Sequence, residues 1–170
     1  LVVWSDYRSG QWPDLYGTRV SPAGMVLDTA GIAISVAPNG QFWPSVAFDG
    51  TNYFIVWQDG RNNVNDDDIY GAKVSKAGVV LDPSGIPISM APGNQCLPSV
   101  AFDGINYFVA WNDGRGGSFS DIYGARVNQE CIALDSTGIP ISTELRNQYT
   151  PSVAFDGTNY FIAWIDQRSG

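Results

Sequence analysis

The chain has 170 residues, of which 44% are hydrophobic and 15% charged, and it carries a net charge of −8 with a pI near 4.2. This composition allows a domain with a buried core and excludes a disordered acidic chain. The acidic balance argues against a nucleic-acid partner and a polybasic membrane contact, and no apolar run is long enough for a membrane-spanning helix.

Strand patterns begin at the first residue. Residues 1–43 contain the aromatic and β-branched run "LVVWSDYR", then "DLYG" and "GIAIS", with the turn signal Ser-Pro-Ala-Gly at 21–24. Residues 44–97 contain four segments: "PSVAFD", "NYFIVWQD", "DIYGAKVS", and "GVVLD" joined through a Gly turn to "GIPIS". Residues 98–150 repeat all four segments, and residues 151–170 repeat the first two. Because no stretch shows capped helical periodicity, the sequence predicts an all-β chain.

These segments form a repeat of 53 or 54 residues, whose Trp recurs at positions 4, 57, 111 and 164. Only the loop between this Trp and the next "YG" changes in length. Four short antiparallel strands in about fifty residues are typical of a β-propeller blade. A β-solenoid or a row of small sandwiches is the alternative, although solenoid coils are usually shorter. We expect propeller-type blades, about three repeats in all, that are incomplete as a single closed ring.

The chain is expected to be a piece of a longer or processed parent, since Leu1 aligns with Phe54 inside a strand and no initiator Met is present. Open blade faces and strand edges predict partners. These would be further blades of a parent chain or copies of the chain itself, closing a ring or extending into a filament.

The phrases "PSVAFDGTNYFIVW", "DIYGAKVSKAGVVLDPSGIPIS" and "WQDGR" resemble tandem, propeller-like repeats of large extracellular proteins of bacteria and archaea. The resemblance covers essentially the whole chain. It implies an extracellular or cell-surface protein and carries no catalytic motif. A looser similarity is to the Asp-box of sialidase-type propellers, Ser-x-Asp-x-Gly-x-x-Trp. Here the Trp precedes the Asp, as in Trp57-Gln58-Asp59, so the sialidase activity is not transferred.

A Trp-x-Asp-x-Arg element closes every aromatic strand. Several Arg side chains could converge on one anionic ligand, but catalytic groups need unlike environments, and this motif is the same in every repeat. We favour a structural staple in which the Asp accepts turn N–H groups. The Arg would pair with that Asp, or with the Asp that opens the next strand (Asp14, Asp68 or Asp121), and lie over an aromatic ring. The staple residues are Asp6, Arg8, Asp59, Arg61, Asp113, Arg115, Asp166 and Arg168.

The loop "NNVNDDDIYG" collects oxygen ligands, and Asp66, Asp67 and Asp68 could hold Ca²⁺. The matching loops lack this acidic run, and the spacing is not that of an EF-hand. A solvated loop without a cofactor is therefore the favoured interpretation. A carboxylate pair for glycoside hydrolysis could come from the same loop, but the spacing selects no pair.

Five aromatic residues lie outside the repeated phrases. Trp12 and Phe119 lie in the loops of variable length, whereas Phe42, Trp43 and Tyr149 lie in the connections to the next repeat. In an up-and-down blade these two kinds of loop share one face. The rings could bind a sugar or a peptide by stacking, or they could fill gaps between blades.

Cys96 and Cys131 show no zinc-site spacing. They are expected at opposite ends of a blade, on strands that are not neighbours, so we predict that they do not form a disulfide with each other.

The symmetric polar motifs, the open blade ends and the absence of His predict a non-enzymatic extracellular repeat module. Its role would be structural or adhesive, and it could assemble into a surface layer or filament. Two alternatives stay open. One is a carbohydrate-binding propeller, and the other is a sialidase- or glycosidase-like hydrolase with part of its catalytic residues outside this chain.

Overall fold

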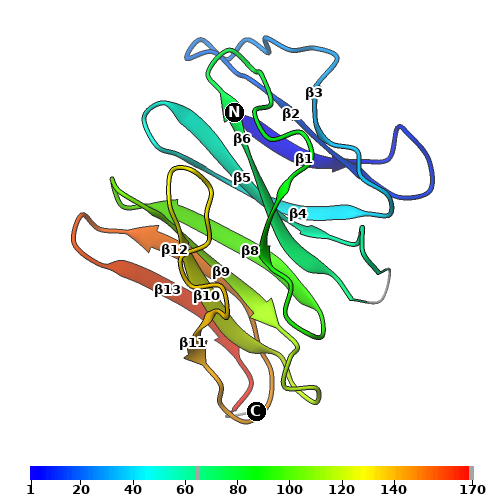
Figure 1. Ribbon diagram of the computed structural model, residues 1–170. Helices are drawn as coiled ribbons and strands as arrows, with labels where there is room; N and C mark the ends of the chain where they lie inside the picture. The colour runs from blue at the N-terminus through cyan, green and yellow to red at the C-terminus, as the bar shows by residue number, and fades with distance from the viewer. Residues whose placement is uncertain (64–65, 169–170) are drawn as a thin grey trace.

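The structure is a computed structural model that describes residues 1–63 and 66–168. Within these residues, thirteen strands form four antiparallel sheets, which follow one another from the blue N-terminal sheet to the orange-red C-terminal one (Figure 1). The all-β prediction is therefore confirmed. The same residues contain no helix that could cross a membrane.

Each sheet is an up-and-down meander, and we call the four sheets the first to fourth blades. The strands are, in the first blade, β1 (Val2–Asp6), β2 (Asp14–Thr18) and β3 (Ile32–Ser35); in the second, β4 (Gln41–Phe48), β5 (Asn52–Asp59), β6 (Asp68–Ser75) and β7 (Ile86–Ser89); in the third, β8 (Gln95–Phe102), β9 (Tyr107–Asp113), β10 (Asp121–Val127) and β11 (Ile139–Ser142); and in the fourth, β12 (Gln148–Phe155) and β13 (Tyr160–Asp166).

The last strand of each complete blade is shorter than predicted. β7 contains only four residues, and the preceding "GVVLD" lies in a loop that makes one isolated bridge, Val74 to Val80. The reason is local, because Asp82 Oδ2 accepts the Lys73 N–H at 2.9 Å and so takes the place of a ladder partner. Gly85, with a φ of 69°, then turns the chain into β7.

The first strand of the second, third and fourth blades begins three residues earlier than predicted, for example at Gln41 in β4 instead of at Pro44. The pairing with β5 shifts between Phe42 and Ser45, because Pro44 has no N–H to donate to the ladder. Trp43 takes a left-handed φ of 51° at this bulge. The prediction that Phe42, Trp43 and Tyr149 lie in the connections is therefore wrong, since all three are strand residues. Cys96 likewise lies within β8 and not before it.

The hydrophobic core lies between blades. In β5, Phe54 and Val56 belong to a cluster shared with β8 and β9 of the third blade. Ile55 and Trp57 belong to a second cluster, shared with Leu15 and the rest of the first blade. Side chains alternate between the two faces of a strand, so a strand between two blades needs apolar residues at every position. This requirement explains the continuous aromatic and β-branched run of β5.

The inner strands β4, β8 and β12 lie side by side and are joined by hydroxyl groups. Ser45 Oγ accepts the Val100 N–H at 3.2 Å, and Ser99 Oγ accepts the Val153 N–H at 3.0 Å. The Ser of "PSVAF" thus links the second blade to the third and the third blade to the fourth.

Candidate functional site: a groove between the first and second blades

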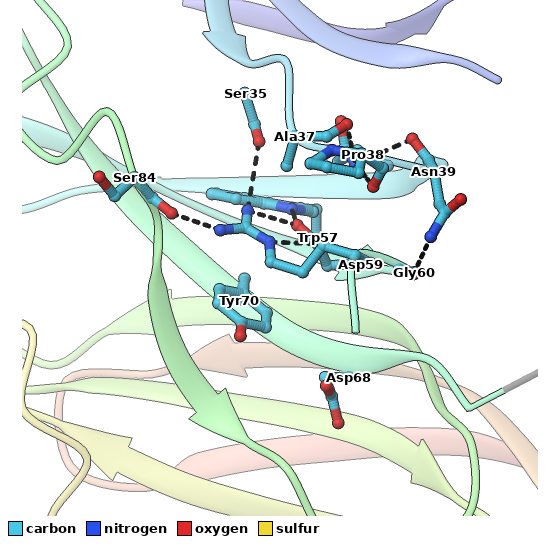
Figure 2. Close-up of polar contacts among 12 residues, drawn as sticks. Ser35, Ala37, Pro38, Asn39, Trp57, Asp59, Gly60, Asp68, Tyr70 and Ser84 are labelled. Atoms are coloured by element: carbon cyan, nitrogen blue, oxygen red, sulfur yellow. Dashed lines mark hydrogen bonds and ion pairs between the residues drawn. The ribbon is translucent and has the colours of Figure 1, made fainter. Parts of the chain in front are cut away.

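The staple of the second blade is a local network around a fully buried carboxylate. Trp57 Nε1 donates to Asp59 Oδ2 at 2.6 Å, and the Arg61 backbone N–H donates to Asp59 Oδ1 at 2.9 Å (Figure 2). The Arg61 guanidinium donates to both carboxylate oxygens and to the Ser84 carbonyl oxygen. It also lies over the Tyr70 ring, 4.1 Å from the ring centroid.

The other staples follow the same scheme. Asp113 and Arg115 form the pair in the third blade, and Asp6 and Arg8 form it in the first. In the fourth blade, hydrogen bonds from Arg168 lower the pKa of Asp166 to about 2. Each Arg pairs with the Asp of its own element instead of the Asp that opens the next strand. Arg61 Nη2 also donates to Ser35 Oγ of the first blade at 3.4 Å, so the staple of the second blade both holds its strand end and contacts the neighbouring blade (Figure 2).

The connections between blades differ at one junction. Asn94 Oδ1 accepts the Asp67 N–H at 2.9 Å between the second and third blades, and Asn147 Oδ1 accepts the Ser120 N–H at 3.0 Å at the next junction. Between the first and second blades, the matching residues are Gly40 and Pro13. Pro13 has no backbone N–H and therefore needs no Asn side chain as an acceptor. Glycine at position 40 leaves free the space that this Asn side chain fills at the other two junctions.

Phe42 occupies this freed space. A Cβ atom placed on Gly40 would lie 2.2 Å from Cε2 of the Phe42 ring, so the ring reaches this position only because residue 40 is glycine. Trp43, next to it at the bulge, is 62% exposed. β-Bulges commonly redirect a side chain beside a functional site.

Four aromatic side chains from the two blades line a groove of about 450 Å³ at this junction. Its polar lining comes from Asn39, Gln58 and Asp67. Asn39 Nδ2 donates to the Gly60 carbonyl oxygen at 2.9 Å, a bond visible in Figure 2 beside the Arg61 staple. Gly60 lies between the two staple residues Asp59 and Arg61, so the staple holds the backbone to which Asn39 is bonded. The four aromatic residues are Tyr7, Trp12, Phe42 and Trp43.

Asp67 is the acidic group of this groove. Gln58 Nε2 donates to Asp67 Oδ2 at 2.6 Å. Burial raises the pKa of Asp67 above its usual range, and the nearby Asp59 and Asp66 act in the same direction, whereas the Gln58 hydrogen bond opposes them. Asp67 is therefore a carboxyl group that takes up a proton more readily than an exposed aspartate.

The structure brings only three of the five predicted aromatic residues together: Trp12, Phe42 and Trp43 meet at the first junction. Phe119 lines a separate hollow with Asn94, Ser120 and Asn147, and the Tyr149 hydroxyl accepts a hydrogen bond from Gln167 Nε2 at 2.8 Å in the fourth blade.

Sequence reasoning missed Tyr7 and the groove role of Gln58 and Asp67. The available signal for Tyr7 was its place in the staple, where the other repeats have Gly60, Gly114 or Gln167.

The acidic run does not gather around one point. Asp68 Oδ2 accepts from Asn62 Nδ2 at 2.8 Å, whereas Asp67 accepts from Gln58. Over residues 1–63 and 66–168, no three His, Cys, Asp or Glu side chains are grouped as metal ligands. Cys96 and Cys131 are both free thiols, and burial raises their pKa values to about 11 and about 12.

Two solved structures are similar to this fold. One is the α-L-arabinofuranosidase from Lactobacillus brevis, with a TM-score of 0.59 and 12% identity over 94% of this chain and 57% of its own. The other is the periplasmic gluconolactonase from Pseudomonas aeruginosa, with a TM-score of 0.55 and 17% identity over 95% of this chain and 46% of its own. This chain thus spans about half the length of the structures it matches. No protein-family model and no curated protein matches it.

The similarity confirms the prediction of propeller-type blades, and at these identities it shows the fold alone. Both neighbours are enzymes, which contradicts the prediction of a non-enzymatic protein. That prediction was wrong in treating symmetric blades as a sign of a purely structural role. A symmetric scaffold can carry a catalytic or binding site in the loops where its repeats differ.

Proposed function

We propose that this chain belongs to a propeller protein that binds carbohydrate, and that the groove between the first and second blades holds the glycan. One observation carries the proposal: four aromatic side chains line a groove whose polar lining is amide and carboxylate. They meet at the junction of the first and second blades. The other two junctions between described blades have an Asn side chain that accepts a backbone N–H, and here Gly40 and Pro13 stand at those two positions.

Sugar chemistry suits such a lining. The aliphatic face of a sugar ring packs on an aromatic side chain, while its hydroxyl groups need both donors and acceptors at the edge. Gln58 and Asn39 offer amide groups, and Asp67 offers a carboxyl group. The groove volume of about 450 Å³ lies within the range of small-ligand sites.

Hydrolysis of the bound glycan is the second candidate function, and Asp67 is the observation that favours it. A general acid must carry a proton near neutral pH, and the pKa of Asp67 is raised by burial. The two structural neighbours are an arabinofuranosidase and a gluconolactonase, so propellers with activity on sugar derivatives supply a precedent.

An extracellular or surface location fits this proposal, and the resemblance of the repeats to those of extracellular proteins supports it.

The test is a glycan array followed by calorimetry on the intact chain and two variants, Trp43→Ala and Trp12→Ala. Each variant should lose glycan binding while keeping its thermal unfolding temperature. Phe119→Ala is the matched control, because Phe119 lies in the corresponding loop of the third blade and is exposed to a similar degree as Trp12. Equal binding by all four proteins would reject the groove as the site. For the second candidate, Asp67→Asn should abolish release of reducing sugar without abolishing binding.

A further inference from the structure

The main chain of Asp67, the acidic group of the groove, is bonded to the neighbouring third blade. Asn94 Oδ1 accepts the Asp67 N–H at 2.9 Å, and the Gln95 N–H donates to the Asp67 carbonyl oxygen at 2.7 Å where the chain enters β8. Asn94 is itself anchored, because its carbonyl oxygen accepts the N–H of Gly114 at 2.8 Å, and Gly114 belongs to the staple of the third blade. The backbone of Asp67 therefore has two attachments to a fixed part of the next blade.

The side chain of Asp67 is held from its own blade. Gln58 Nε2 donates to Asp67 Oδ2 at 2.6 Å. A Cβ atom placed on Gly60 would lie 2.9 Å from Asp67 Oδ1, so this oxygen fills space that a glycine at position 60 leaves open. With its backbone and its side chain both held, the carboxyl group has a defined position in the groove before a ligand arrives. A polar group that is held in this way distinguishes ligands more sharply than a mobile one.

The same backbone attachment occurs at the next junction, but there it holds a different side chain. Asn147 Oδ1 accepts the Ser120 N–H at 3.0 Å, and the Gln148 N–H donates to the Ser120 carbonyl oxygen at 2.7 Å. The attachment by itself is therefore part of the blade architecture. Asp67 adds a carboxyl group to it, and this carboxyl group lines the groove, whereas Ser120 lines a separate hollow. Asn147 thus provides a matched control for the role of Asn94.

We propose that Asp67 is the specificity-determining residue of the groove and that Asn94, at the entry to the third blade, is its positioning residue. This inference rests on the proposed carbohydrate-binding function and states how the groove selects one sugar among epimers. A carboxyl group in a fixed position bonds a hydroxyl group at one place on the sugar ring. An epimer whose hydroxyl group points the other way leaves the carboxyl group without that bond, and its affinity is lower.

The test measures a ratio of affinities between epimers instead of the affinity for one sugar. The probes are methyl β-glucoside with its epimers at C2, C3 and C4 (the mannoside, alloside and galactoside), and methyl β-xyloside with its C4 epimer, methyl α-L-arabinoside. NMR titration of the intact chain follows the indole N–H signals of Trp12 and Trp43. One epimer should bind at least about tenfold more tightly than the others of its series.

Four variants assign the selectivity to Asp67 and Asn94. Asp67→Ala and Asn94→Ala should both reduce the ratio to below about threefold, the first by removing the carboxyl group and the second by releasing it. Asn94→Asp should restore the ratio, because a carboxylate oxygen can accept the same N–H. Asn147→Ala should leave the ratio unchanged, although it should lower the thermal unfolding temperature as much as Asn94→Ala does.

The outcomes separate this inference from the proposed function. Equal changes of the ratio in Asn94→Ala and Asn147→Ala, no change in either, or no rescue by Asn94→Asp would overturn the positioning role while leaving carbohydrate binding intact. Binding without a preference between epimers would overturn the role of Asp67. If the intact chain binds none of these glycosides and no glycan on the array, the proposed function itself is rejected.

Discussion

The hydroxyl group of Tyr107 donates a hydrogen bond of 2.8 Å to Asp49 Oδ2 and so joins the third blade to the turn between β4 and β5 of the second. The Tyr107 ring lies 4.5 Å from the ring of Phe54 on the preceding blade, and the Tyr160 ring lies 4.9 Å from that of Phe108. In the phrase "NYF", the Tyr therefore covers the Phe of the blade before it. A short sequence motif thus encodes both halves of the contact between blades.

Tyr107→Phe should lower the free energy of unfolding by about 2 kcal/mol, because it removes a hydrogen bond to a charged group at a buried position. Burial raises the pKa of Asp49, but N–H bonds from Asn52 and Thr51 and the Tyr107 hydroxyl outweigh it, so the net pKa is lowered. A lowered carboxyl pKa contributes stability above its unfolded value of about 4, and this contribution is lost as the pH falls below that value.

Urea unfolding at pH 7 and at pH 3 measures both effects. The difference in stability between the original chain and Tyr107→Phe should shrink at the lower pH. An equal difference at both pH values would contradict a role for the charged form of Asp49.

Arg61→Met should destabilise the protein by about 3 kcal/mol or more, since it leaves the fully buried Asp59 carboxylate without its cation. Arg8→Met is the matched control, because the Asp6–Arg8 pair has the same geometry but Arg8 is 43% exposed. Its loss should be less than half that of Arg61→Met in thermal or denaturant unfolding. Equal losses would mean that the contribution of the Asp–Arg pair to the free energy of unfolding does not depend on its burial.

The blade itself could be predicted from sequence because its determinants are local. The continuous apolar run Phe54–Trp57 identifies a strand that is buried on both faces. The turns around it are marked by Gly and Asp. The pairing of Asp59 with Arg61 spans two residues and follows from the same short motif.

The groove could not be predicted in the same way. The Asp67–Asn94 contact joins residues that are 27 positions apart across a blade junction, and no periodicity indicates it. This contact and its counterpart between Ser120 and Asn147 show that Pro13 and Gly40 occupy matching positions. The three buried glutamines Gln41, Gln95 and Gln148 were missed for a similar reason, since their amide groups bond the carbonyl oxygens of the connections, as Gln41 Nε2 does with Ala37.

Phe108→Ala should cost about 3 kcal/mol or more, because Phe108 is only 8% exposed beneath Tyr160 of the fourth blade. Phe161 occupies the same position in the fourth blade but is 70% exposed. Phe161→Ala should therefore change the stability of this chain by less than about 1 kcal/mol. Denaturant unfolding of the two variants makes the comparison, and a large loss for Phe161→Ala would show that its face is covered in solution.

Neither thiol should react in the folded protein. Burial raises the pKa of Cys96 to about 11 and that of Cys131 to about 12, so both are protonated at pH 8. A chromogenic disulfide reagent should titrate almost no thiol in buffer and both thiols in concentrated guanidinium chloride. Rapid reaction of either thiol in buffer would contradict the packing around it.

Gly40→Ala should weaken glycan binding through the position of Phe42. The added Cβ would lie 2.2 Å from the ring, so the ring must leave its place in the groove. The loss of packing should destabilise the protein by about 1–3 kcal/mol. Calorimetry with a bound oligosaccharide should show an affinity about tenfold lower.

A double-mutant cycle separates the clash from any other effect of the new methyl group. In a Phe42→Ala background, Gly40→Ala has no ring to displace and should cost almost nothing in urea unfolding, which gives a coupling energy close to the whole single-mutant loss. The backbone of Gly40 lies outside the left-handed region, so alanine itself fits there. If Gly40→Ala is equally destabilising in both backgrounds, Phe42 does not occupy the space that Gly40 leaves, and the groove has a different shape.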